Sequence, residues 1–209
     1  MNIPVIYEDE WFLVADKPAG LLVVPTPKRE TRTLTSILNE DALLKGYSCR
    51  LYPCHRLDRD TSGLIIYAKG KAARKKMEDI FRERKIKKSY FSLVSGIPPK
   101  KESRITALVF GLSATTDYRV VKKWKDFSEL EVNPLTGRTN QIRLHLKQLG
   151  CPILGDYRFA LRRDFKIKAK RLCLHAKSLE FTHPFTGSRI CLEAPLPQDL
   201  RGLLQRHHA

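Results

Sequence analysis

Short runs of residues that favour β-strands recur along most of this chain, and short turns join most neighbouring runs. The first two flank the acidic turn Glu8–Glu10, and the last two flank a turn around Pro184. The strand-forming runs cover 3–7, 11–15, 64–68, 90–96, 104–110, 117–124, 127–135, 177–181 and 188–194. Because strands joined by short turns pair in antiparallel fashion, the pattern predicts a mixed α+β fold around a mostly antiparallel sheet.

Three helical segments are expected to flank that sheet. Thr33 can cap a helix that runs to about Leu44, and residues 70–88 form a second, very basic helical segment. Thr139 can cap a third helix that runs to Leu149, where a glycine follows. No internal repeat, low-complexity tract or linker interrupts the sequence, so we expect one domain over residues 1–209.

The charge of the chain points to a polyanionic partner. Lys and Arg number 39 against 22 Asp and Glu, which gives a net charge of +17. A generically basic protein would spread this charge evenly, but here it concentrates in residues 70–88 and 158–171. The basic residues are Lys71, Arg74, Lys75, Lys76, Arg82, Arg84, Lys85, Lys87 and Lys88 in the first segment and Arg158, Arg162, Arg163, Lys166, Lys168, Lys170 and Arg171 in the second. We expect both segments to contact nucleic-acid phosphates, which supply affinity but little sequence information.

Several other kinds of site leave no trace in the sequence. The five cysteines are odd in number and form no CxxC, so we expect buried free thiols in a reducing compartment. No dinucleotide-binding glycine loop, Walker motif or HxxxH pair occurs, so we expect neither a cofactor nor a metal. No secretory signal or apolar run of about 20 residues is visible, so we expect a soluble cytoplasmic protein without a membrane partner. A monomer is the default expectation.

Polar segments adjoin the predicted core at three places. They cover 55–63, 137–145, and 174–176 together with 183–187. A cluster of charges beside a buried strand must be solvated or paired, because burying a lone charge is costly. Arg143 would lie at the edge of the apolar stripe of its helix, where it could reach a carboxylate.

The residues of these segments resemble those of a known family. The stretch HRLDRDTSGLIIYAK looks like the signature of the RluA-type pseudouridine synthases. Further family motifs follow the same order as in that family: YEDEWFLVADKPAGLLVVP, KKSYFSLVSG, GRTNQIRLHL, PILGD and LHAKSLEFTHPFTG. The resemblance covers about residues 4–196 and implies an α+β pseudouridine synthase domain, with an active-site cleft across a central antiparallel sheet. The chain resembles the members of this family that lack a small RNA-binding domain of the S4 type.

The resemblance also implies roles for individual residues. Asp58 matches the catalytic aspartate of the family, and Arg143 matches the basic residue that pairs with it. Tyr90 matches the tyrosine that stacks on the target base and is a candidate for the final deprotonation. Arg56 matches the residue that helps to fill the space left by a flipped base, and Leu174 matches an apolar residue of the pocket. The implied substrate is a uridine in structured ribosomal or transfer RNA.

The residue types suit the chemistry of this reaction. Pseudouridine formation breaks an N-glycosidic bond, rotates the uracil and joins its C5 to the sugar, so it needs an ionised carboxylate near C1′ or C6. Burial alone would raise the pKa of Asp58, and a paired Arg143 would keep it charged. A base that leaves its stack needs an aromatic face and a filler for the vacated space, which Tyr90 and Arg56 supply. Arg138, in the motif of Arg143, is a further substrate-binding candidate. Attack at C1′ and attack at C6 both remain open.

Two positions depart from the family pattern. Asn140 stands where the family usually has histidine, and Phe159-Ala160 follow Gly155-Asp156 where the family usually ends in Tyr-Gly. Asn140 can still donate and accept hydrogen bonds, whereas the altered segment puts the local loop conformation in question. Asp60 is expected to be structural, and four histidines are expected to be hydrogen-bonded structural residues: His55, His145, His175 and His183.

Two other functions compete with an RNA pseudouridine synthase. A catalytically silent RNA-binding or ribosome-assembly factor would share the basic surface, but Asp58, Tyr90 and Arg143 are all present. A nucleotide glycosidase that used the same aspartate would release free uracil.

Overall fold

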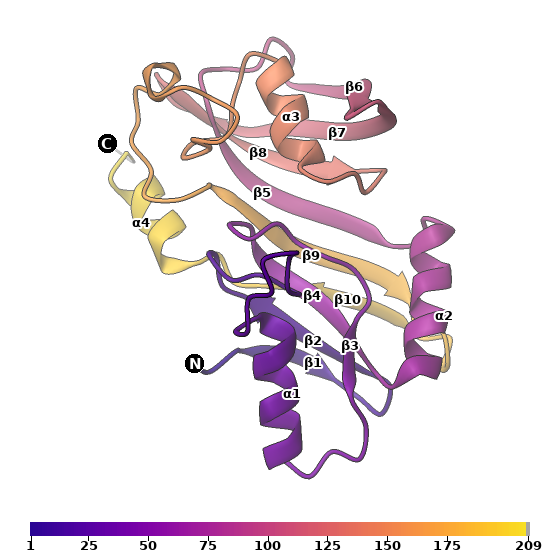
Figure 1. The fold of residues 1–209 in the computed structure, drawn as a ribbon. Helices are drawn as coiled ribbons and strands as arrows, with labels where there is room; N and C mark the ends of the chain where they lie inside the picture. Colours follow the sequence, from indigo (N-terminus) through magenta and orange to yellow (C-terminus); the bar gives the residue numbers. More distant parts are fainter. Residues whose placement is uncertain (208–209) are drawn as a thin grey trace. The chain divides into compact units, whose positions relative to one another are not determined.

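The computed structural model describes residues 1–207 and divides into two compact units (Figure 1). Unit 1 contains Met1–Lys87 and Ser178–Ala194, and unit 2 contains Lys88–Lys177 and the segment from Pro195 onward. The single domain expected over 1–209 stays a prediction. Within the described residues, no helix has both the length and the apolar character needed to span a membrane.

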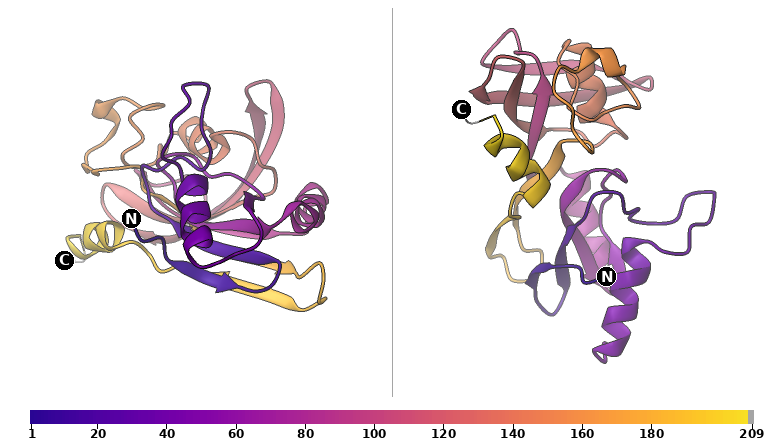
Figure 2. Two further views of the ribbon diagram at one scale, coloured as in Figure 1. Left: turned by 60° about the horizontal axis from the view of Figure 1, so that its bottom comes forward. Right: turned by 90° about the vertical axis from the view of Figure 1, so that its left-hand side faces the viewer.

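Unit 1 is built on antiparallel strands. β1 (Val5–Glu8) pairs with β2 (Phe12–Lys17), which pairs with β4 (Ser62–Lys69). The short β3 (Leu51–Pro53) also pairs with β4, and β10 (Arg189–Glu193) pairs with β9 (Leu174–Thr182). The helices α1 (Leu34–Leu44) and α2 (Lys71–Arg82) complete the unit, with α1 along one face of the strands (Figure 2).

Strand β4 is buried on both faces, which explains why its sequence is a continuous apolar run rather than an alternating one. Leu64 and Ile66 contribute to a core cluster that also contains Phe12 of β2 and Met77 of α2. Tyr67 is also fully buried, and its hydroxyl lies 2.9 Å from Oγ1 of Thr35 in α1. The strand therefore anchors the polar segment that precedes it.

Unit 2 contains antiparallel strands paired in the order β5-β8-β7-β6. Its strands are β5 (Lys87–Ser95), β6 (Glu102–Val109), β7 (Leu112–Lys123) and β8 (Phe127–Pro134). Helix α3 (Gln141–Gln148) lies against β6, β7 and β8, and its Ile142 and Leu146 join the core. A 3-10 turn (Arg162–Asp164) and α4 (Gln198–Gln205) complete the unit. The predicted α+β class is confirmed.

Some element boundaries differ from the sequence prediction. The helix expected over 70–88 ends at Arg82, because Arg84 adopts a left-handed backbone with φ 57°; Lys87 and Lys88 belong to β5. Helix α3 begins after Asn140, not Thr139, and Asn140 has φ 58° and no side-chain capping bond. The sequence prediction also missed β3 and α4, which are a three-residue strand and a short terminal helix.

The five cysteines are free thiols. Cys54, Cys151 and Cys173 are buried, as expected, but Cys49 is half-buried and Cys191 is exposed. Burial raises the pKa of Cys54 and of Cys173 to about 12, so these two thiols are unreactive near neutral pH.

Candidate active site

The HRLD segment lies in unit 1, between β3 and β4. Arg56 is exposed, Leu57 is buried and Asp58 is half-buried, so the chain alternates between solvent and core at this point. His55 anchors the start of the segment, because its Nε2 accepts a hydrogen bond from the Ile66 backbone N–H at 3.0 Å. The carbonyl of Asp58 accepts from the Thr61 N–H at 3.2 Å and closes a turn before β4. His55 is therefore structural, as predicted.

A buried lysine that the sequence analysis did not single out, Lys17, fixes the backbone of Arg59, the residue after Asp58. Lys17, at the end of β2, is fully buried, and its ammonium donates to three backbone carbonyls. These belong to Pro18 at 2.9 Å, Leu21 at 2.7 Å and Arg59 at 2.9 Å. A buried ammonium is stable only when its donors are satisfied, so Lys17 ties the residue after Asp58 to the loop that follows β2. The sequence DKPAG, part of the first family motif, contains Lys17 and could have indicated that this lysine has a structural role.

Arg143 lies on α3 in unit 2, and its side chain is only 6% exposed. Its Nε donates to Oδ2 of Asp156 at 2.8 Å, and its Nη2 donates to Oδ1 of the same carboxylate at 2.6 Å. This bidentate pair is buried on both sides, because Asp156 is 2% exposed. Asp156 was identified from sequence only as part of the PILGD motif. The structure thus gives Arg143 a carboxylate partner inside its own unit.

Both departures from the family pattern contact Arg143. Asn140 accepts a hydrogen bond from Nη1 of Arg143 at 2.8 Å. The guanidinium carbon of Arg143 lies 4.6 Å from the centroid of the Phe159 ring. The guanidinium carbon of the exposed Arg158 lies 5.3 Å from the same centroid. Three side chains therefore fix the orientation of one guanidinium: a carboxylate, an amide and an aromatic ring.

Backbone geometry places Asp156 next to α3. Gly155 has φ 78°, and a Cβ atom there would lie 2.0 Å from the carbonyl oxygen of Arg171, so only glycine fits. The Asp156 N–H donates to the carbonyl of Ile153, and the Ala160 N–H donates back to the carbonyl of Asp156. The altered segment after Gly155-Asp156 therefore still forms an ordered turn.

The other predicted residues of unit 2 lie on neighbouring elements. Tyr90 is half-buried on β5, opposite Val132 of β8, and packs against the core of the unit. Leu174 is buried at the start of β9. Arg138 is exposed just before α3, and its Nε donates to the Ser113 carbonyl at 3.3 Å. Unit 2 thus holds four of the six predicted site residues, and unit 1 holds Arg56 and Asp58; the pairing of Asp58 with Arg143 stays a prediction.

A family model described as RNA pseudouridylate synthase matches residues 11–148, which include the HRLD segment and Arg143. The chain belongs to the RNA pseudouridylate synthase family. The chain is 35% identical to the dual-specificity RNA pseudouridine synthase RluA of Haemophilus influenzae, over 92% of each chain. It is 33% identical to the ribosomal large subunit pseudouridine synthase C of Buchnera aphidicola, over 98% of this chain and 70% of the other. The resemblance to RluA-type synthases is thereby confirmed.

A solved structure supports the fold of this pseudouridylate synthase. The human RNA pseudouridylate synthase domain containing 4 superposes with a TM-score of 0.82, over 97% of this chain and 92% of the other. The two sequences are 24% identical, so this likeness concerns the fold.

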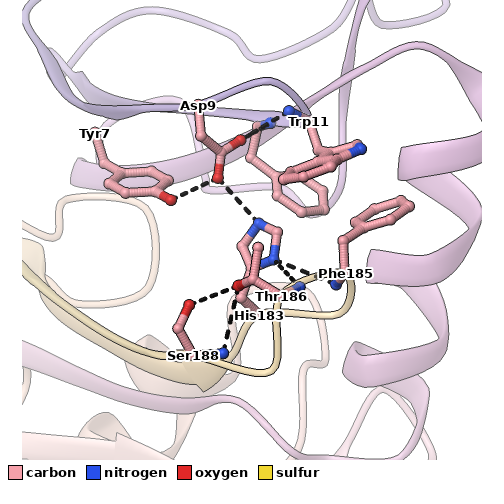
Figure 3. Close-up of polar contacts among 8 residues, drawn as sticks. Tyr7, Asp9, Trp11, His183, Phe185, Thr186 and Ser188 are labelled. Atoms are coloured by element: carbon pink, nitrogen blue, oxygen red, sulfur yellow. Dashed lines mark hydrogen bonds and ion pairs between the residues drawn. The ribbon is translucent and has the colours of Figure 1, made fainter.

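The HPFTG motif of the synthase forms a polar network in unit 1 (Figure 3). Nδ1 of His183 accepts hydrogen bonds from the backbone N–H groups of Phe185 and Thr186, at 3.2 and 3.1 Å. Its Nε2 must then carry the proton, and it lies 2.9 Å from Oδ2 of Asp9 without the alignment of a good hydrogen bond. Tyr7 donates to the same oxygen at 2.5 Å. His183 joins the turn after β1 to the β9–β10 hairpin, which supports the predicted structural role.

His145 is also structural. It is fully buried on α3, and its Nδ1 lies 2.9 Å from Oγ1 of Thr116 on β7. Burial lowers its pKa, despite an opposing hydrogen bond with the backbone of Ala107, so the ring is neutral at physiological pH.

Local carboxylates neutralise part of the basic surface of the synthase. On α2, Arg74 pairs with Glu78 and Arg82 pairs with Asp79, but Lys71, Lys75 and Lys76 are exposed cations. In the segment 158–171, Lys166 pairs with Asp126 and Arg171 pairs with Asp199. The exposed cations of that segment outside these pairs are Arg158, Arg162, Arg163, Lys168 and Lys170. Within residues 1–207, no group of three or more His, Cys, Asp or Glu side chains is arranged to hold a metal.

Proposed function

We propose that this chain converts specific uridines of structured ribosomal or transfer RNA to pseudouridine, with Asp58 as the catalytic residue. The observation that supports the proposal is the place of Asp58 in the HRLD segment, which resembles the family signature, lies within the residues matched by the family model and is anchored by Lys17 and His55. A half-buried carboxylate on an anchored segment can meet a substrate without losing its position.

The proposed reaction transfers uracil within a single nucleotide. Asp58 attacks C1′ of the ribose or C6 of the base, and the N-glycosidic bond breaks. The uracil then rotates, its C5 joins C1′, and the bond to Asp58 breaks, so the carboxylate is released. The hydrogen on C5 leaves as a proton, for which Tyr90 is the proposed acceptor, and N1, freed from the sugar, takes up a proton. Atoms and electrons therefore balance. We propose that Arg143, fixed by Asp156 and Asn140, pairs with Asp58 and keeps it ionised.

The same proposal assigns the handling of the RNA. The target base must leave its stack, so Arg56 helps to fill the vacated space while Tyr90 stacks on the base and Leu174 lines the pocket. Arg138 and the exposed cations of α2 and 158–171 contact phosphates and supply affinity that falls with salt. A relative named for the large ribosomal subunit supports ribosomal RNA as a substrate. Location in the cytoplasm and a monomeric state stay predictions.

The test compares two neighbouring aspartates. The substitution Asp58→Asn keeps the shape of the side chain and removes its charge, and Asp60→Asn makes the same change at an exposed position two residues away. Ribosomal and transfer RNA from cells that lack the gene is incubated with each purified full-length variant, and pseudouridines are mapped. We expect the D58N rate to fall at least about 10³-fold. The D60N rate should stay within about threefold of the unmodified protein.

Other outcomes would reject the assignment. If D58N forms pseudouridine at the normal rate, Asp58 is not catalytic. If the unmodified chain binds RNA but mapping finds no pseudouridine, the silent RNA-binding function replaces the proposal. Free uracil detected by mass analysis would indicate a glycosidase.

A further inference from the structure

The hairpin between β6 and β7 in unit 2 ends in an exposed apolar tip. Leu108, Phe110 and Leu112 are 63%, 68% and 53% exposed, although they lie within five consecutive residues. Leu108 pairs with Ser113 and Val109 pairs with Leu112, so Leu108 and Leu112 lie on opposite faces of the ribbon. The tip is therefore apolar on both faces, with Phe110 at its end.

The turn itself is built from residues that its geometry disfavours. Phe110 and Gly111 are its two central residues, with φ 49° and 77°. Positive φ at both positions is the type I′ arrangement, which favours Asn-Gly because asparagine and glycine tolerate the left-handed region. A phenylalanine there is strained and gains no burial in return. Local conflicts of this kind concentrate at functional positions, where contact with a partner compensates for the strain.

A guanidinium lies beside the same tip. Arg138 is exposed, and its Nε contacts the carbonyl of Ser113, the residue after Leu112. An aromatic ring stacks on a nucleobase and a guanidinium binds a phosphate, so the two side chains together match one nucleotide. A narrow tip with apolar side chains on both faces also suits insertion beside a base better than contact with a flat protein surface.

We propose that the β6–β7 tip is an RNA-docking surface, in which Phe110 stacks on an unpaired base and Arg138 binds a neighbouring phosphate. The choice of RNA as the partner rests on the proposed function and on the net charge of +17. The tip selects RNA that presents an unpaired base.

The experiment uses Phe110→Asn, because asparagine fits the turn better than phenylalanine does. We expect the Tm of this variant to rise by about 2–4 °C, so that weaker binding cannot come from misfolding. Binding of the full chain to a fluorescein-labelled RNA stem-loop with a uridine-containing loop is followed by anisotropy across a salt series. F110N should bind about tenfold more weakly, or about 1.4 kcal/mol, with an unchanged salt slope, and Phe110→Trp should restore binding. Arg138→Gln should instead reduce the slope by about one.

The control is Leu44→Asn, which removes an 86% exposed apolar side chain from the end of α1. The proposal is overturned if F110N and L44N bind the stem-loop equally well, a result that would assign the tip to a protein partner. It is also overturned if F110N weakens binding only by changing the salt slope. Pseudouridine mapping with the unmodified chain separates the two proposals. If F110N loses RNA binding while the unmodified chain forms no pseudouridine, the docking surface stands and only the catalytic function is rejected.

Discussion

Replacing Asp156 by asparagine removes the carboxylate charge beside Arg143 and leaves the shape of the side chain almost unchanged. Asp156 receives two hydrogen bonds from the guanidinium, at 2.8 and 2.6 Å, and both side chains are buried within unit 2. The asparagine can still accept one of these bonds, but the charge of Arg143 loses this partner.

The structure sets the size of the expected effect. Two unit charges about 4 Å apart attract by about 4 kcal/mol at an effective dielectric constant of about 20. Removing one partner of a buried pair typically destabilises a protein by about 3–5 kcal/mol. Because one hydrogen bond survives in D156N, we expect the lower end, about 3 kcal/mol. For an m-value of about 2 kcal/mol per molar urea, the unfolding midpoint falls by about 1.5 M.

The exposed pair of Arg104 and Asp117 provides a matched control. It lies on β6 and β7 in the same unit and is also bidentate, at 2.7 and 2.8 Å, but its arginine is 62% exposed. Asp117→Asn should therefore cost about 1 kcal/mol or less.

Tryptophan fluorescence can follow unit 2 alone. The chain has two tryptophans, Trp11 in unit 1 and Trp124 in unit 2, so a Trp11→Phe background leaves only the second. Urea unfolding of D156N and D117N is compared in that background. Equal losses of stability in the two variants would show that burial does not strengthen the Arg143–Asp156 pair, and the reasoning would fail.

Two further results are expected. The substitution Lys17→Met should lower the free energy of unfolding by about 3 kcal/mol and slow pseudouridine formation, because the carbonyls of Pro18, Leu21 and Arg59 each lose a hydrogen bond from the buried ammonium. An unchanged urea midpoint would contradict this. Burial acts to raise the pKa of Asp9, but hydrogen bonds from Tyr7 and the Phe12 and Trp11 backbones outweigh it and lower that pKa. Asp9 therefore stabilises the fold above its unfolded pKa of about 3.9 and loses this effect as pH falls through the folded value. Urea midpoints measured between about pH 6 and 2 should consequently fall less steeply for Asp9→Asn, and parallel curves would refute the assignment.

Local sequence patterns predicted most of the elements correctly. The apolar run at 64–68 forms a strand buried on both faces, and Thr33 caps α1 as expected, with its side chain accepting from the Ser36 N–H. These features depend on periodicity and on nearest neighbours, which the sequence contains directly. The predicted end of α2 was wrong because a left-handed residue, Arg84, stops the helix where no neighbouring glycine or proline signals an end.

The site was only partly predictable for a different reason. The ordered motifs identified Asp58, Arg143 and Tyr90 as candidates, but they did not show what contacts them. Lys17 reads as an ordinary surface cation until its three carbonyl partners are known. Contacts between residues distant in sequence depend on how the chain folds back, and no local pattern encodes them.

The sequence by itself determined the fold class, the family and the residue types available for catalysis, because motif order and strand spacing are properties of the chain. Only the tertiary structure decided that Asn140, Asp156 and Phe159 all surround the Arg143 guanidinium. It also decided that Phe110 stands exposed at a strained turn. Both results depend on which atoms approach within a few ångströms, and packing fixes those distances.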